Sequence, residues 1–144
     1  MAWRGPHPML LLVLLATWLA LARGETRFGK FQRQHVAPPR TGPQNNRDYC
    51  NSMMRSRGMT SPVCKRTNTF IHVNNVNPIT NVCGPGGTPA PKNLHDSIAH
   101  FNLTTCRLQG GSQRPPCNYK GNTKYRPIRI GCVRRLPVHF DRII

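Results

Sequence analysis

The sequence predicts a single α+β domain, with short helices in its first half and antiparallel strands in its second half. Three observations lead to this prediction. Apolar residues recur at helical spacing near the start of the domain, strand-like alternation begins at His100, and six cysteines lie in a chain of only 144 residues. A chain of this length has room for one domain, which excludes kinases, large barrels and two-domain dehydrogenases.

The first 24 residues are typical of a secretory signal peptide. Arg4 precedes an unbroken apolar run, Met9–Ala22, that is shorter than the roughly 20 residues of a membrane span. Small residues follow, with one cleavage site after Ala22 and another after Gly24. We therefore expect a signal peptide over 1–24 and a secreted domain over 25–144.

Two helices are predicted early in that domain. Phe28, Phe31 and His35 fall on one helical face, which predicts a helix over 25–36. A proline-rich linker follows. The pattern over Asp48–Arg55 predicts a second helix.

The ends of that second helix have their own signals. We expect a cap near Asn46 and a stop at Gly58. A third short helix is predicted within residues 74–83, and the glycines and prolines of residues 84–91 predict a loop.

Strands are predicted mainly in the second half. The first covers Lys65–Val73, where β-branched residues and Phe70 alternate with polar ones. From residue 100 onward, four further strand-like stretches are separated by turn residues: 101–108, 117–119, 125–133 and 137–140.

The six cysteines predict three disulfides in an oxidising compartment. They stand at Cys50, Cys64, Cys83, Cys106, Cys117 and Cys132. None forms a Cys-x-x-Cys pair, so we expect no zinc site. Their spacing alone leaves the pairing open.

The chain is strongly basic. Its 21 Lys and Arg outnumber 4 Asp and Glu, for a net charge of +17. Removal of residues 1–24 takes away Arg4 and Arg23 and leaves a net charge of +15. Such a surface attracts polyanions: nucleic acid, heparin-like glycans or acidic membrane faces. A merely solvated cationic surface is the alternative, but this charge exceeds what solubility needs.

Two histidines are candidates for acid–base chemistry. His35 lies near the start of the domain and His139 near its end, with Asp141 two residues beyond. In an extended strand, positions 139 and 141 share a face, so the carboxylate could orient the imidazole. The alternative is that each histidine is structural.

Three motifs, in this order, resemble those of the pancreatic-type ribonuclease superfamily, the ribonuclease A family. They are Lys30–His35, Cys64–Phe70 and Pro137–Asp141. The six cysteines, together with Arg55–Gly58 and Gly110–Cys117, are most similar to the angiogenin branch.

The resemblance implies a ribonuclease A-like fold, with three short helices and a curved, V-shaped antiparallel sheet. It implies the disulfides Cys50–Cys106, Cys64–Cys117 and Cys83–Cys132. It also implies catalysis without metal or cofactor, in which His35 is the general base, His139 the general acid and Lys65 stabilises the phosphorane.

The remaining implied site residues contact the substrate. Gln34 and the Phe140 backbone would contact the reacting phosphate, Thr69 the pyrimidine, and Lys30 and Arg33 outlying phosphates. The implied substrate-binding set is Lys30, Arg33, Gln34, Asn68, Thr69, Phe140 and Asp141.

Several positions depart from the family pattern. Val133 replaces a glutamate that binds the second base, and Arg142 stands where angiogenins carry a glutamine that obstructs the pyrimidine site. The neutral stretch 84–91 replaces part of the angiogenin cell-binding surface. Arg55-Ser56-Arg57 is similar to the angiogenin nuclear-entry cluster, and a solvated helix end is the alternative.

One motif falls outside that resemblance. Asn102-Leu103-Thr104 is an N-glycosylation sequon. Its glycosylation implies a surface position, although the local pattern is that of a strand.

The leading hypothesis is a secreted endoribonuclease that cleaves single-stranded RNA after pyrimidines through a 2′,3′-cyclic phosphate. It is expected to be monomeric, with RNA as partner and with heparin-like glycans, bacterial surfaces or an acidic ribonuclease inhibitor as further partners. Nuclear entry, granule storage, host defence and angiogenic activity remain open. The alternatives are a cationic antimicrobial or heparin-binding protein, and an angiogenin-like growth factor with weak catalysis.

Overall fold

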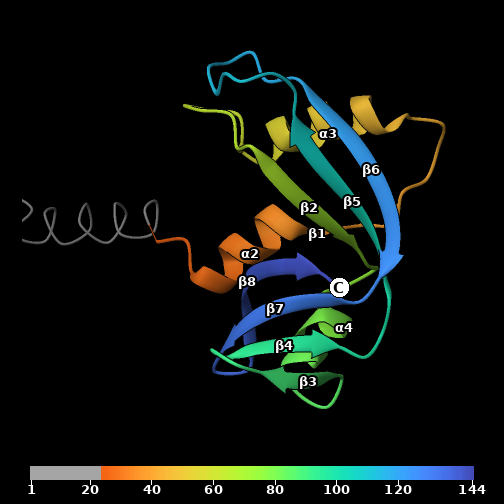
Figure 1. The fold of residues 1–144 in the computed structure, drawn as a ribbon, viewed down its shortest axis with the longest axis vertical. Helices are drawn as coiled ribbons and strands as arrows, with labels where there is room; N and C mark the ends of the chain where they lie inside the picture. Colours follow the sequence, from red (N-terminus) through yellow and green to blue (C-terminus); the bar gives the residue numbers. More distant parts are fainter. Residues whose placement is uncertain (1–23) are drawn as a thin grey trace, which may run out of the picture.

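The computed structural model describes residues 24–144 and has the predicted α+β fold (Figure 1). The proposed signal peptide therefore lies, except for Gly24, outside the described residues. The helices are α2 (Arg27–His35), α3 (Asn46–Ser56) and α4 (Asn77–Thr80), which runs into a 3₁₀ turn, η1 (Asn81–Cys83). The strands are β1 (Val36–Ala37), β2 (Thr67–His72), β3 (Gly87–Ala90), β4 (Leu94–Ser97), β5 (Phe101–Leu108), β6 (Tyr119–Arg126), β7 (Ile128–Val133) and β8 (Leu136–Ile143).

The strands form two four-stranded sheets rather than one continuous sheet. One has the order β1-β2-β5-β6 and the other β3-β4-β7-β8. All pairs are antiparallel except the short β1–β2 pair. Helix α2 packs against β2 of the first sheet and β8 of the second, as Figure 1 shows. This helix therefore joins the two sheets.

Helix α2 is held by side chains at both ends and along one face. The hydroxyl of Thr26 caps its start by accepting from the Gly29 amide at 2.9 Å. Phe31 and His35 are buried on its inner face, as their spacing predicts. At its end, the Arg57 guanidinium donates to the carbonyls of Arg33 and Val36, both at 2.8 Å.

This use of Arg57 bears on the basic segment Arg55-Ser56-Arg57. Arg57 is only partly exposed, and its charge lies at the C-terminal end of a helix, where the helix dipole favours a cation. In return, Arg33 donates to the Arg57 carbonyl at 2.6 Å. The segment is therefore not a freely solvated cluster, because one of its two arginines fastens α2 to α3.

Helix α3 begins earlier than the sequence predicts. Its cap is Asn45, whose side chain accepts from the Asp48 amide at 2.8 Å. Asn46 instead accepts a hydrogen bond from Arg40 at 2.6 Å, a contact that local pattern does not reveal. Gly58, with φ +76°, ends the helix as predicted, in the Schellman arrangement.

Three of the predicted strand and loop boundaries are wrong. The predicted loop 84–91 contains β3, which pairs with β4 and carries Pro89 at the sheet edge, where its missing N–H costs no ladder bond. The predicted strand 125–133 is divided between β6 and β7 at Pro127. The stretch 117–119 contributes only Tyr119 to β6.

The buried residues form two clusters, one on each face of β2. Ile71 lies in the cluster that contains Phe31, and Phe70 lies in the cluster that contains Tyr49. Because adjacent strand residues point to opposite faces, β2 is buried on both sides. This burial fixes the position of Thr69, whose carbonyl faces α2.

Three disulfides connect these elements. They are Cys50–Cys106, Cys64–Cys117 and Cys83–Cys132, the pairs that the resemblance implies, and no free cysteine remains among the described residues. Each spans 49 to 56 residues, so each stabilises the fold by about 4 kcal/mol in the chain-entropy description. None of them reaches α2, because the first cysteine is Cys50.

Replacement of Arg57 by alanine tests how α2 is held. We expect Arg57→Ala to lower the free energy of unfolding by about 2 kcal/mol, since charged hydrogen bonds to helix carbonyls are lost. Arg55→Ala, at an exposed position of α3, is the control and should change it by less than about 0.5 kcal/mol. Equal losses in urea unfolding would contradict this role for Arg57.

Candidate active site

A cleft of about 580 Å³ opens where α2, β2 and β8 meet. It contains both histidines that the sequence singles out, together with Lys65. The residues that line it are Arg27, Lys30, Phe31, Gln34, His35, Lys65, Thr67, Asn68, Thr69, Val138, His139, Phe140 and Asp141.

His35 is buried at the end of α2 with one ring nitrogen occupied. Its Nδ1–H donates to the Thr69 carbonyl at 2.8 Å, which leaves Nε2 as the basic nitrogen of the neutral ring. Burial lowers the pKa of His35 to about 4, against the opposing effect of the Thr69 bond, and the charge of Lys65 lowers it further. The imidazole is therefore neutral at physiological pH and can accept a proton.

Lys65 lies in a small polar network beside His35. Its ammonium donates to the side-chain oxygens of Asn68 at 3.0 Å and Gln34 at 3.3 Å. Asn68 in turn donates to the Gln34 carbonyl at 2.7 Å. Burial lowers the pKa of Lys65, and the positive charges of Lys30 and Arg33 lower it further. An anion that binds beside Lys65 would therefore stabilise the charged form of its side chain.

His139 differs from His35 in its exposure. Its side chain is 61% exposed, and Nε2 lies 3.7 Å from a carboxylate oxygen of Asp141. That distance suits an ion pair once His139 is protonated but is too long for a hydrogen bond. The other Asp141 oxygen accepts from Arg142 at 3.0 Å. One imidazole is thus enclosed and the other is accessible.

Thr69 and Phe140 complete the walls. The hydroxyls of Thr69 and Thr105 lie 3.0 Å apart, so each can donate to or accept from the other. The Phe140 ring stacks on the His35 ring with centroids 5.3 Å apart. Thr69 and Phe140 thus both contact His35 and form the walls of the cleft beside it.

Two basic residues are not part of the cleft lining. Arg33 is occupied by Glu25, through contacts of 2.7 and 2.9 Å, and by the Arg57 carbonyl. Arg142 bonds to Asp141 and is not among the lining residues. The structure thus brings together every predicted substrate-binding residue except Arg33.

Sequence reasoning missed Arg27 and Thr105. Arg27 lies one helical turn before Lys30 and two before Gln34, so the spacing of these polar residues on α2 was the available signal. Thr105 meets Thr69 only through pairing of β2 with β5, which the sequence does not reveal.

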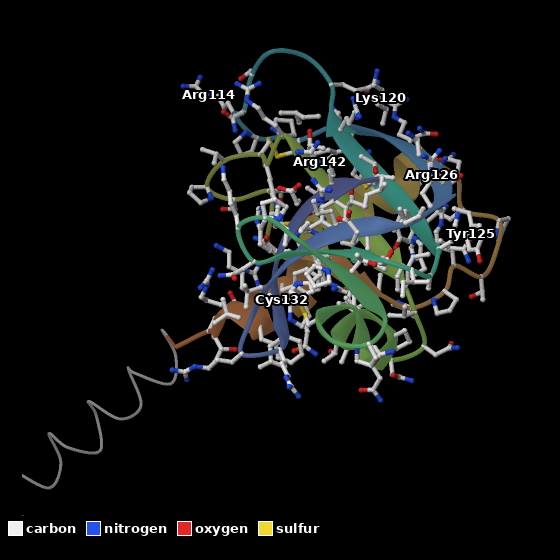
Figure 2. All side chains as sticks on the ribbon, turned by 60° about the horizontal axis from the view of Figure 1, so that its bottom comes forward. Arg114, Lys120, Tyr125, Arg126, Cys132 and Arg142 are labelled. Atoms are coloured by element: carbon white, nitrogen blue, oxygen red, sulfur yellow. A yellow bond between two sulfur atoms is a disulfide. The ribbon has the colours of Figure 1, made fainter. Side chains whose placement is uncertain are left out.

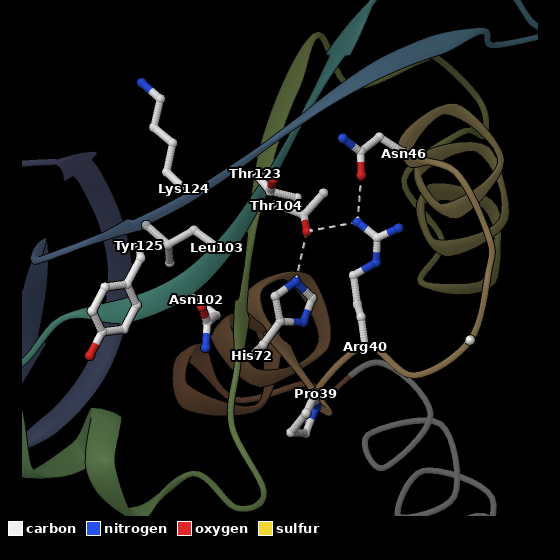
Figure 3. A pocket seen from close by; sticks show the side chains of 11 residues that line it. Pro39, Arg40, Asn46, His72, Asn102, Leu103, Thr104, Thr123, Lys124 and Tyr125 are labelled. Atoms are coloured by element: carbon white, nitrogen blue, oxygen red, sulfur yellow. Dashed lines mark hydrogen bonds between the residues drawn. The ribbon is translucent and has the colours of Figure 1, made fainter.

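The cleft is not the largest hollow. A hollow of about 650 Å³ lies beside β5 and β6, where His72, Arg40 and Tyr125 are visible in Figure 3. There, His72 bonds through both ring nitrogens, to the Pro38 carbonyl and to Thr104. Both ring nitrogens of His72 are therefore engaged in hydrogen bonds, whereas His35 uses only Nδ1 and keeps Nε2 free. No cluster of three metal-binding side chains occurs within residues 24–144.

The fold and the cleft define a small disulfide-bonded protein equipped for proton transfer beside an anion. Residues 26–141 match the sequence profile of the pancreatic ribonuclease family. The chain belongs to this family.

Named relatives agree with that assignment. The chain is 64% identical to a ribonuclease of Chelonia mydas over 120 residues, which are 83% of this chain and all of the turtle protein. It is 42% identical to angiogenin of Mus musculus over 140 residues, 95% of this chain and 94% of the mouse protein. The crystal structure of green turtle egg white ribonuclease superposes with a TM-score of 0.80 at 63% identity, over 83% of this chain and all of that one.

Titration of His35 should make stability depend on pH. Its folded pKa of about 4 lies below the ordinary value of 6.5, so its stabilising contribution is complete above pH 6.5 and is lost as pH falls toward 4. The full loss is about 3 kcal/mol. In His35→Asn, urea unfolding at about pH 7 and about pH 4.5 should show a smaller difference than in the unchanged protein.

Some pH dependence should remain in that variant, because burial also lowers the pKa of His72. An unchanged difference between the two pH values would show that His35 does not titrate in this way.

Proposed function

We propose that this chain is a secreted, basic, metal-independent endoribonuclease that cleaves single-stranded RNA on the 3′ side of pyrimidines. The observation that carries the proposal is the pairing of a buried, neutral His35 with an exposed His139 in one cationic cleft. The family membership and the named ribonuclease relatives support it.

The cleavage step needs only proton transfer and charge stabilisation, because RNA carries its own nucleophile. Nε2 of His35 takes the proton from the ribose 2′-OH, and the 2′-oxygen attacks the adjacent phosphorus. Protonated His139 gives its proton to the departing 5′-oxygen, and the ammonium of Lys65 stabilises the added negative charge. The product is a 2′,3′-cyclic phosphate, which water then opens with the histidine roles reversed.

The surrounding residues orient the substrate. The Thr69 amide and hydroxyl pair with the pyrimidine, and its hydroxyl is oriented by Thr105. Gln34 and the Phe140 amide contact the reacting phosphate, and Lys30 attracts a neighbouring one. Arg33 already donates to Glu25 and to the Arg57 carbonyl, so an outlying phosphate has to compete with Glu25 for its guanidinium.

Polyanion binding without chemistry is the second candidate function. The chain carries 21 basic and 4 acidic residues, and long basic side chains such as Arg114 and Lys120 extend from the surface in Figure 2. Heparin-like glycans, bacterial surfaces or an acidic inhibitor protein suit this surface. Such binding is compatible with catalysis.

The proposed secretion has a consequence at Asn102. This residue is exposed on β5, whereas the sequon threonine, Thr104, is fully buried and bonded to His72 (Figure 3). The folded sequon is therefore not available to a transferase. Modification has to precede the pairing of β5 with β6, which lies later in the chain.

The first test is cleavage of a short RNA with a single pyrimidine, in excess chelator. His35→Ala and His139→Ala should each reduce cleavage by about 10²- to 10⁴-fold, because each removes one proton-transfer group. His100→Ala, at an exposed position away from the cleft, is the control and should retain activity.

Two results complete that test. The unchanged protein should release a 2′,3′-cyclic phosphate and leave the matching 2′-deoxy oligonucleotide intact. Full activity in either cleft variant would exclude this mechanism, and no cleavage by correctly disulfide-bonded protein would favour binding alone.

Mass spectrometry of protein secreted by eukaryotic cells tests the sequon. We expect an N-linked glycan on Asn102 that N-glycosidase removes, and none on Asn102→Gln. Protein refolded before exposure to the transferase should stay unmodified, because Thr104 is buried. Modification of the refolded protein to the same extent would contradict the proposed order of events.

A further inference from the structure

Two adjacent turns hold an unusual concentration of left-handed backbone. Within residues 24–144, the non-glycine residues with positive φ are Lys92, Asn93, Arg134 and Arg135, with φ between 51° and 66°. The first two lie in the turn between β3 and β4, and the last two form the turn between β7 and β8. Only asparagine among these types adopts such φ values readily.

The two turns lie side by side. Strand β4 pairs with β7 so that Leu94 faces Gly131, and the Asn93 carbonyl accepts from the Cys132 amide at 3.1 Å. Figure 1 shows both turns meeting at the same end of the lower sheet. We call Lys92, Asn93, Val133, Arg134, Arg135 and Leu136 the paired-turn tip.

The charge of the paired-turn tip is not compensated. Lys92, Arg134 and Arg135 are exposed, and within the described chain no side-chain hydrogen bond or ion pair holds them. Three of the four acids pair with other arginines, namely Arg33, Arg129 and Arg142. The fourth, Asp48, lies in the first turn of α3.

Aliphatic side chains accompany these cations. Val133 and Leu136, the residues on either side of the two arginines, are 40% and 37% exposed. Sulfated glycans offer no apolar surface to such side chains, and RNA offers only the faces of its bases. A phospholipid bilayer offers both anionic headgroups and acyl chains at one boundary.

We propose that the paired-turn tip is a binding site for anionic phospholipid membranes. The arginines contact the headgroups, and Val133 and Leu136 enter the boundary between headgroups and acyl chains. The site goes beyond the proposed ribonuclease activity, because none of its residues lines the catalytic cleft. It also explains why arginines occupy a two-residue turn that asparagine and glycine would form with less strain.

The test compares two double variants that each remove two positive charges. Arg134→Asn with Arg135→Gly installs residues that favour this turn, so the variant should fold and melt at the same or a higher temperature. Arg55→Gln with Arg114→Gln removes two exposed arginines elsewhere and is the matched control. Binding is measured by sedimentation with vesicles of phosphatidylcholine and phosphatidylglycerol.

We expect the turn variant to lose roughly 30-fold in vesicle affinity, as for two cations at an anionic surface, and the control to lose only a few-fold. RNA cleavage should be the same in both double variants. Equal losses of vesicle affinity would overturn the proposal, because they would show attraction by overall charge. A selective loss of heparin binding, with vesicle binding retained, would overturn it as well.

Insertion of the aliphatic residues has a separate readout. The only tryptophans, Trp3 and Trp18, lie in the proposed leader, so the secreted product should have none; mass spectrometry checks this. Val133→Trp should show a blue shift and quenching by brominated anionic lipid, whereas Ile98→Trp, at a residue 66% exposed beyond β4, should not. The same response from both positions, or from neither, would overturn the proposal.

Discussion

The hydrogen bond from His35 to the Thr69 carbonyl is the contact on which the candidate site depends. It orients the imidazole, selects the tautomer with a free Nε2, and joins the end of α2 to β2. Thr69 is itself fixed because β2 is buried on both faces. No disulfide reaches α2, so this bond, the burial of Phe31 and the Arg57 contacts hold His35 in place without a covalent link.

The distribution of charge follows from that arrangement. Lys65 is partly buried near other cations, so its ammonium is destabilised until an anion enters the cleft. The few carboxylates are used to hold arginines in place: Glu25 binds Arg33, and Asp96 binds Arg129 at 2.6 Å. Most of the positive surface is therefore left free to attract polyanions, and the disulfides offset part of the resulting self-repulsion.

The sequence predicts those parts of the fold that local pattern determines. The strand Phe101–Leu108 has its predicted bounds, because alternating residues end at a Gly-Gly turn. Gly58 ends α3 because the left-handed backbone there suits glycine. The motifs for His35, Lys65 and His139 bring residues from three distant segments into one cleft, which the resemblance implies and spacing alone does not.

The remaining features depend on contacts between distant segments. Composition assigns 87–90 to a loop, yet pairing with β4 makes it a strand. The roles of Arg57 at the end of α2 and of Thr105 beside Thr69 arise only when separate elements meet. The choice of Asn45 over Asn46 as cap depends on Arg40, which occupies the second asparagine.

The turn between β7 and β8 has to fix the pairing of these two strands, but that requirement does not determine which two residues form the turn. Its two residues pair Val133 with Leu136, and a bulge between Gly131 and Cys132 then shifts the register by one residue, so that His139 lies opposite Gly131. A side chain at 131 would press on His139, since a Cβ there would lie 3.1 Å from the His139 Cβ. A one-residue slip would turn His139 away from the cleft. The position of His139 therefore accounts for the tight turn and for the positive φ at both of its positions. It does not explain two arginines, because asparagine and glycine would set the same register with less strain. The charge of this turn consequently needs a reason outside the cleft, and its exposed aliphatic neighbours indicate a surface that is both anionic and apolar.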